Sequence, residues 1–150
     1  KRPKEIVIRA VNLIVPNNLD GKHMSQAGAK QYQQMSIQTS VTNASPHQLI
    51  AMLLDGLLGR LAQAKGHIDR LDYEGKSHCL GSAITIIGAL QNALAFEKGG
   101  EIASNLDRLY VYMTRRVFTA GVANDVEIID EVVSLVRTVK EGWDSIKDEV

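Results

Sequence analysis

Apolar residues recur every three or four positions after residue 45, which is the spacing of one face of an α-helix. The clearest start signal is Ser45-Pro46-His47-Gln48, where Ser45 fits the N-cap, Pro46 the first helical position and Gln48 the third position of a capping box. The predicted helix runs to about Arg70. Its inner stripe is Ile50, Leu53, Leu54, Leu57, Leu61, Ala64 and Ile68.

Three further helices are predicted, over about residues 73–96, 102–120 and 125–147. Asp72 can cap the first of these, and Gly99-Gly100 ends it. Gly121 suits the position just past the end of the next helix, and Asn124 or Asp125 suits the N-cap of the last one. Because short connections make successive helices antiparallel neighbours, the predicted fold is all-α, an antiparallel up-down four-helix bundle over 45–150.

The residues before the bundle follow a different pattern. Residues 24–44 are polar with scattered apolar side chains, and they are interpreted as an N-terminal arm that can lay Tyr32 and Ile37 into a groove. Residues 1–23 hold a β-branched run that stops at Pro16, and His23-Met24 follows. We interpret 1–23 as a tag or fusion segment, with a native extension or a peptide from a partner as alternatives.

The second and fourth predicted helices have more apolar residues than one buried face requires. From Leu80 to Phe96, 11 of 17 residues are apolar, against about 7 for a core-facing helix. Beside the stripe through Leu80, Ile87 and Leu94 runs an outer stripe of Ile86, Ala89, Ala93 and Phe96. The fourth helix has a second stripe of Ile128, Val132, Leu135, Val139 and Ile146.

An exposed second stripe would be unfavourable, because burying each Leu or Ile side chain is worth roughly 1.5–3 kcal/mol. We therefore expect a partner helix, a second copy or the arm to cover it, and a contiguous uncovered patch would mark an interaction site. The alternative is that the arm or residues 1–23 simply cover it, or that these helices are more central than expected. Gly81 and Gly88, seven residues apart, also indicate close helix approach, within the chain or to a partner.

Composition and charge exclude several classes of protein. The chain has 150 residues, 17 basic and 17 acidic; residues 1–23 carry a net charge of +3 and the remainder −3. A mildly acidic domain without a basic stripe is a poor nucleic-acid binder. The single cysteine excludes an intramolecular disulfide, and no apolar stretch is long enough to span a bilayer. With no secretory leader visible, we predict a cytoplasmic protein without membrane insertion.

Catalytic and metal-binding motifs are not found in the sequence. It contains no Glu-x-x-His, His-Glu-x-x-His, Cys-x-x-Cys, Walker loop or Gly-x-Ser-x-Gly. Glu74 and His78 are interpreted as an exposed polar pair, Cys79 as a buried small apolar residue, and His47, in a first helical turn, as a surface residue. We predict that the protein is not an enzyme and has no cofactor, catalytic residue or metal site.

Several strings resemble the flagellin-specific export chaperone family FliS. They are Tyr32-Gln-Gln-Met-Ser-Ile-Gln-Thr-Ser, Ala44-Ser-Pro-His-Gln-Leu-Ile-Ala-Met-Leu-Leu-Asp-Gly56, Lys98-Gly-Gly-Glu-Ile-Ala-Ser-Asn-Leu106 and Leu109-Tyr-Val-Tyr-Met-Thr-Arg-Arg116. The resemblance covers about residues 24–150. It implies a helical bundle that binds the C-terminal disordered region of flagellin in the bacterial cytoplasm. The chaperone prevents premature polymerisation and delivers flagellin to a type III secretion export gate.

The resemblance and the stripe argument together nominate a partner-binding set. Tyr32 matches the family's arm tyrosine, which is implicated in arm closure and export-gate contact; the other members follow from the apolar stripes and the third helix. The set is Tyr32, Ile86, Ala89, Leu90, Ala93, Phe96, Tyr112, Val132 and Leu135. Flagellin, an export-gate component and other flagellar regulators are the predicted partners of a monomer or weak dimer. The alternative function is a self-associating structural bundle that forms a homodimer without a client.

Overall fold

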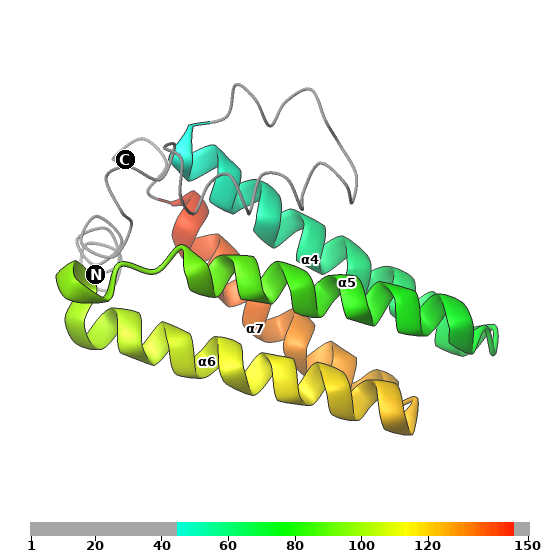
Figure 1. Cartoon of the computed structure of the whole chain (residues 1–150). Coiled ribbons are helices and arrows are strands. Elements are labelled where there is room, and N and C mark those ends of the chain that lie inside the picture. The colour runs from blue at the N-terminus through cyan, green and yellow to red at the C-terminus, as the bar shows by residue number, and fades with distance from the viewer. Residues whose placement is uncertain (1–44, 146–150) are drawn as a thin grey trace.

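The computed structural model describes residues 45–145, which form four helices. They are α4 (Pro46–Asp69), α5 (Tyr73–Asn92), α6 (Phe96–Ala123) and α7 (Val126–Asp144), shown in Figure 1. Within this described range the chain is all-α, which confirms the predicted fold class. The predicted N-terminal arm, the 1–23 segment and the last residues of the fourth helix lie outside the described residues.

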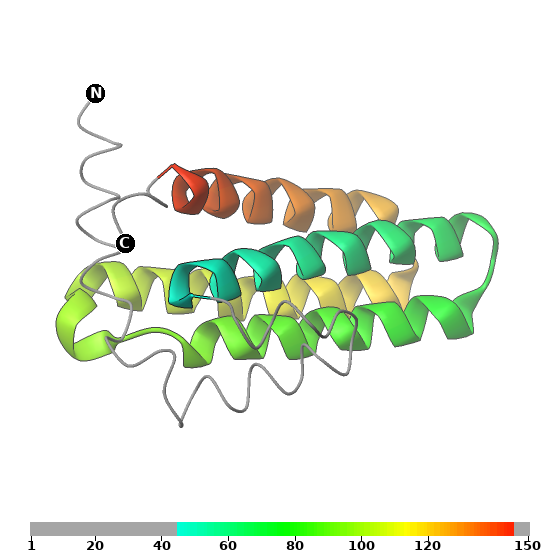
Figure 2. The ribbon, with the colours of Figure 1, turned by 90° about the horizontal axis from the view of Figure 1, so that it is seen from above.

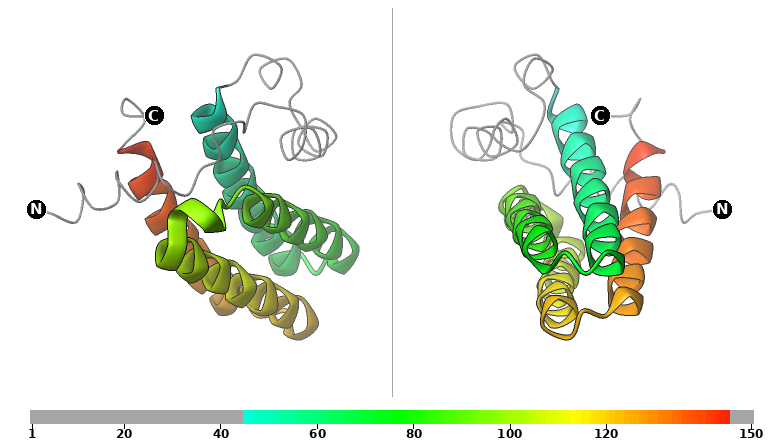
Figure 3. Two further views of the ribbon diagram at one scale, coloured as in Figure 1. Left: turned by 60° about the vertical axis from the view of Figure 1, so that its left-hand side comes forward. Right: turned by 90° about the vertical axis from the view of Figure 1, so that its right-hand side faces the viewer.

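Successive helices run antiparallel, and each packs against two others. Helix α4 contacts α5 and α7, and α6 contacts the same two helices from the other side. The views from above and along the bundle show this four-cornered arrangement (Figures 2 and 3). The α4–α5 and α6–α7 turns lie at the same end of the bundle (Figure 1). Each helix therefore has two different faces in contact with neighbouring helices. Which apolar stripes are buried depends on these contacts.

The helix starts follow the local signals in the sequence. At α4 the Gln48 N–H donates to Ser45 Oγ at 3.1 Å while the Ser45 N–H donates to Gln48 Oε1 at 2.8 Å, so the predicted capping box is formed. Asp72 caps α5 by accepting from the Gly75 N–H at 3.0 Å. Asp125 caps α7 by accepting from the N–H groups of its second and third residues. These contacts satisfy donors that a helix start leaves without an intrahelical partner.

The predicted end of the second helix is wrong, whereas the predicted interruption at Gly99-Gly100 is present as a kink. Helix α5 ends at Asn92 instead of Phe96, and its last turn tightens as the Ala93 N–H donates to the Leu90 carbonyl. Helix α6 begins at Phe96, earlier than predicted, but its backbone is non-helical at Gly100, with φ 52° and ψ −124°, where the break was predicted. Since glycine adopts positive φ without a Cβ clash, the chain kinks there and continues as a helix.

The end of α6 also differs from the prediction. Gly121 was expected just past the last turn, but it remains helical, and the left-handed residue that ends the helix is Asn124, with φ 54°. Asparagine tolerates this conformation better than most residues with a side chain. The Lys76 ammonium of α5 donates to the Gly121 carbonyl and to Asn124 Oδ1, both at 2.7 Å. A cation is favourable at this end of a helix, where the backbone dipole is negative.

The core forms where the four inner faces meet. All seven residues of the predicted α4 stripe are buried, and Met113 and Val117 of α6 meet Ile129 and Val136 of α7 in the same cluster. His47 was expected at the surface, but it is buried against Trp143 of α7. The two rings stack with centroids 4.7 Å apart, because α7 ends beside the start of α4. Cys79 is buried, as expected.

Candidate functional site

The outer stripe predicted on α5 is not an exposed surface. Ile86, Ala89, Leu90 and Ala93 are each 5% exposed or less. A partner helix, a second copy or the arm was expected to cover this stripe, and the binding role of these side chains stays a prediction. Only Phe96, which stands at the start of α6, is exposed among the members of that stripe.

The two stripes of α5 serve its two neighbouring helices. Cys79 Sγ lies 3.5 Å from Gln63 Oε1 of α4, and Ile86 and Ala93 follow Cys79 at intervals of seven residues, on the same side of the helix. On another side, Gln91 Nε2 donates to Asp107 of α6 at 2.9 Å. Helix α5 therefore lies between two neighbours and contacts both α4 and α6.

The same reasoning applies to α7. Val132 is fully buried, and Leu135 is partly buried against the core. Glu131 faces α6, because its Oε1 accepts from the Arg116 guanidinium at 3.0 Å. Leu135 comes four residues after Glu131 and so lies on the α6 side as well. The second stripe of α7 is thus the face that packs on α6.

Tyr112 and Phe96 are the nominated residues that the structure leaves accessible, at 40% and 46% exposure. The Tyr112 hydroxyl donates to Glu131, which also pairs with Arg116, so the three side chains link α6 to α7. The hydrogen bond raises the pKa of Tyr112, and the two donors together hold the pKa of Glu131 below its usual value. Tyr32, the remaining nominated residue, lies outside the described part of the chain.

The exposed apolar side chains are concentrated on α6, where the sequence analysis did not look for them. Of the eight large apolar residues exposed between residues 45 and 145, six belong to this helix and two to the start of α5 and the turn before it. They are Phe96, Ile102, Val111, Tyr112, Phe118 and Val122 on α6, with Leu71 and Tyr73. Phe118 and Val122 are the most exposed of the six, at 66% and 72%.

Val111, Phe118 and Val122 form a row that the sequence could have revealed. They are separated by seven and four residues and lie away from the buried Met113 and Val117. The sequence analysis compared the density of apolar residues in each helix, and α6 has a low density. A second apolar row on a mostly polar helix is the signal that was missed.

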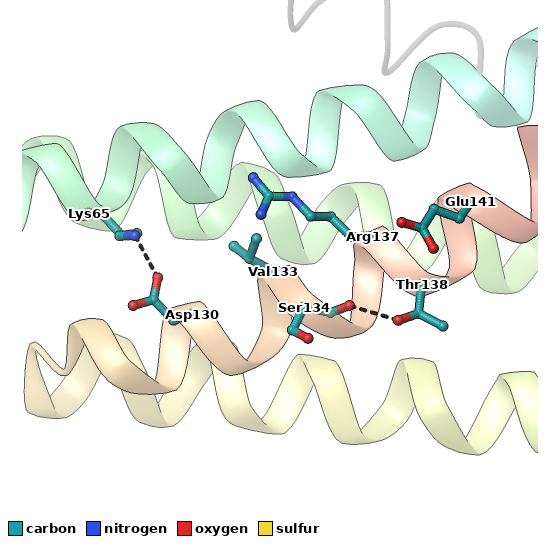
Figure 4. A pocket seen from close by; sticks show the side chains of 7 residues that line it. All are labelled: Lys65, Asp130, Val133, Ser134, Arg137, Thr138 and Glu141. Carbon is teal, nitrogen blue, oxygen red and sulfur yellow. Dashed lines mark hydrogen bonds and ion pairs between the residues drawn. The ribbon is translucent and has the colours of Figure 1, made fainter.

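A polar groove runs along α7 beside α4. Its lining residues are Lys65, Asp130, Val133, Ser134, Arg137, Thr138 and Glu141 (Figure 4). Lys65 Nζ and Asp130 Oδ1 form an ion pair at 2.5 Å, and the Thr138 hydroxyl donates to the Ser134 carbonyl at 3.1 Å. These two contacts link α7 to α4 and one turn of α7 to the next.

Metal-ligand clusters and membrane-spanning helices are both absent between residues 45 and 145. Between residues 45 and 145, no group of three or more His, Cys, Asp or Glu side chains is placed to hold a metal ion. None of the four helices described is long and apolar enough to cross a membrane. The notable chemical feature of this part of the chain is therefore its exposed apolar surface.

Comparison with known proteins gives one consistent result. The family model described as "Flagellar protein FliS" matches residues 28–150. The chain is 51% identical over 117 residues to the flagellar secretion chaperone FliSB of Pseudomonas aeruginosa, which covers 78% of this chain and 93% of that protein. It is 44% identical over 121 residues to the flagellar secretion chaperone FliS of Salmonella typhimurium, covering 80% and 90%. The corresponding Escherichia coli protein is 37% identical over 117 residues, covering 77% and 86%.

Proposed function

Because this chain belongs to the FliS family, whose relatives are flagellar secretion chaperones, we propose that its client is the C-terminal segment of flagellin. The chain binds this segment in the bacterial cytoplasm, before export. While the segment is covered, flagellin cannot polymerise prematurely. The complex then delivers flagellin to the export gate, where release allows secretion.

The observation that supports a binding role is the exposed apolar surface of α6. Phe118 and Val122 are more than half exposed on a helix whose other side is buried in the core. Burying a side chain of this size stabilises a complex by roughly 1.5–3 kcal/mol, so a client helix with apolar anchors gains from covering them. A disordered client loses part of this gain on ordering, which keeps the affinity moderate and permits release.

The nominated residues divide into two groups under this proposal. Phe96 and Tyr112 are accessible in the structure and are assigned to direct client contact. Ile86, Ala89, Leu90, Ala93 and Val132 are buried, and Leu135 is partly buried, so their contribution is to support the surface from beneath. Tyr32 is assigned to the arm and its contact with the export gate.

Titration calorimetry of the full chain with a synthetic flagellin C-terminal peptide tests the proposal. We expect exothermic binding with a negative heat-capacity change, together with a gain of helical circular dichroism as the peptide folds. Phe96→Asp should weaken binding, whereas Thr138→Asp, on the exposed surface of α7, should not. Wild-type protein that neither binds the peptide nor changes its helicity would contradict the proposed client.

A further inference from the structure

The end of the bundle where two interhelical turns meet has features that neither the core nor the nominated set uses. The α4–α5 turn and the α6–α7 turn lie at this end (Figures 1 and 2). Lys76 of α5 joins them, because its ammonium donates to the Gly121 carbonyl and to Asn124 Oδ1, both at 2.7 Å. Residues 67–76 and 124–127 therefore belong to one surface, which we call the turn end.

Leu71 occupies a position of the first turn that normally belongs to glycine. The Leu71 N–H donates to the Ile68 carbonyl at 3.0 Å. The Asp72 N–H donates to the His67 carbonyl at 2.8 Å, which completes the Schellman ending of α4. This ending requires a left-handed backbone at residue 71, and Leu71 adopts it with φ 61°. A leucine is strained there, because its Cβ crowds the following carbonyl oxygen.

The Leu71 side chain also remains largely in water. It is 71% exposed, and Tyr73, two residues further on, is 45% exposed. These are the two large apolar residues exposed between residues 45 and 145 that lie outside α6. A strained and exposed leucine is unfavourable twice in the free chain, whereas glycine at the same position avoids both costs. A residue that breaks local preference in this way is typical of a functional position.

The turn that presents Leu71 is held in one shape. Asp72 Oδ1 accepts from the Gly75 N–H at 3.0 Å, and the other carboxylate oxygen lies 3.0 Å from His67 Nδ1. The His67 ring packs directly on Gly75, where a Cβ would come within 2.5 Å of Nδ1. Beyond the turn, the Lys76 ammonium lies 5.3 Å from the centre of the Tyr73 ring. A surface fixed in this way loses little conformational freedom when a partner binds.

The turn end carries the net negative charge of the described bundle. Residues 67–76 and 124–127 hold five carboxylates and two basic side chains, a net charge of −3 with neutral histidine. The other described residues hold eight acidic and eight basic side chains, so their net charge is zero. Asp69, Glu74 and Glu127 are exposed, and their side chains form no ion pair with another described residue. Such a surface repels nucleic acid and anionic lipid and attracts a basic protein surface.

We propose that the turn end is a docking site for a partner protein that presents lysine or arginine side chains around apolar ones. Leu71 is the anchor that enters the partner, Tyr73 extends the apolar contact, and the carboxylates pair with the basic side chains. The inference goes beyond the proposed function, because the turn end shares no residue with the set nominated for the flagellin client. It explains why a leucine stands where the backbone favours glycine.

The first test measures what Leu71 costs the free chain. In thermal unfolding of the full chain, Leu71→Gly should raise the melting temperature by about 2–5 °C, because the left-handed strain is removed. Leu71→Ala, which keeps the strain and removes the exposed side chain, should leave it unchanged. A lower melting temperature for Leu71→Gly would show that the leucine stabilises the turn, and it would overturn the proposed role.

The second test measures the apolar contact with two probes, acetyl-Arg-Lys-Leu-Leu-Lys-Arg-amide and acetyl-Arg-Lys-Ser-Ser-Lys-Arg-amide. In nuclear magnetic resonance titrations of the full chain, the leucine peptide should shift the Leu71 and Tyr73 signals and bind about fivefold more tightly than the serine peptide. Leu71→Ala should remove most of this preference, whereas Ile102→Ala, at an exposed aliphatic residue of α6, should keep it. An equal preference in Leu71→Ala and the wild type would refute the anchor.

The third test concerns the charge. Affinity for the leucine peptide should fall as salt is added, and Asp69→Asn with Glu74→Gln should weaken binding about fivefold and reduce that salt dependence. Glu101→Gln with Glu141→Gln removes the same charge from exposed residues away from the turn end and should bind as the wild type does. Equal losses from the two pairs would show a general attraction and refute the site.

Photo-crosslinking in the cells that encode the chain tests the occupant. With p-benzoylphenylalanine in place of Tyr73, we expect a crosslink to a protein segment in which lysine or arginine flanks apolar residues. Asp69→Asn with Glu74→Gln should abolish it. A crosslink to flagellin would return the turn end to the client surface, and a crosslink to a second copy of this chain would assign it to self-association. Either result, a crosslink that survives the charge changes or no crosslink would overturn the proposal.

Discussion

The contact between His47 and Trp143 should be a major source of stability, because it ties the start of α4 to the end of α7. The indole N–H donates to the His47 carbonyl at 2.9 Å, and His47 Nε2 lies 2.9 Å from the Trp143 carbonyl. Since a carbonyl can only accept, Nε2 carries the proton and donates. The rings are stacked within 8° of parallel, and both residues are buried.

The geometry allows the cost of each substitution to be worked out. Trp143→Phe keeps a ring for stacking but removes one hydrogen bond, about 1 kcal/mol, and leaves space beside the smaller ring, about 1 kcal/mol more. His47→Ala removes the other hydrogen bond and the ring pair, again about 2 kcal/mol. Because the two variants remove part of the same contact, the double variant should cost about 1 kcal/mol less than the sum.

Urea unfolding followed by far-ultraviolet circular dichroism is the suitable assay, because Trp143 is the single tryptophan and its fluorescence is lost in the variant. In thermal unfolding followed by the same signal, each single variant should lower the melting temperature by about 4–8 °C for a chain of this size. Tyr73→Phe, a change at an exposed aromatic residue, is the control and should leave the unfolding curve unmoved. A coupling energy below about 0.3 kcal/mol would refute the reciprocal contact.

Three further predictions concern buried side chains and side chains that link two helices. Leu90→Asp should abolish helical circular dichroism at 25 °C, because loss of the buried leucine side chain costs about 2–5 kcal/mol and the new carboxylate would be buried without a partner. A thermal unfolding curve like that of the wild type would show that Leu90 is accessible and belongs to the candidate client surface. Lys76→Met should cost about 2 kcal/mol in urea unfolding, through two lost hydrogen bonds from a charged donor, and wild-type stability would contradict that role. The pKa of Glu131 is lowered on folding, so its contribution to stability is complete above about pH 4.5 and declines as the pH falls further. Glu131→Gln should therefore flatten the acidic part of the curve of stability against pH. If the variant and the wild type lose stability equally in acid, the link between α6 and α7 is refuted.

Local chemistry in the sequence was sufficient to predict four helices and the starts of α4, α5 and α7. A capping side chain satisfies backbone donors within three residues of itself, so Ser45 and Asp72 could be assigned without knowing the fold, and the cap of α7 could be limited to Asn124 or Asp125. The apolar spacing of α4 likewise identified its buried face. The sequence predicted Gly121 as the residue just past the end of the third helix, whereas the helix ends at Asn124, and Lys76 from another helix hydrogen-bonds to both residues.

Only the tertiary structure decided which apolar rows are covered. Ile86 and Phe118 are both apolar residues of predicted helices, yet one is fully buried and the other is two-thirds exposed. The difference lies in what stands opposite each residue, α4 in the first case and open surface in the second. A helix between two neighbours buries two rows, and the sequence of that helix does not contain the positions of its neighbours. The sequence thus determines how many apolar side chains each helix carries, whereas the exposure of those side chains depends on how the four helices pack.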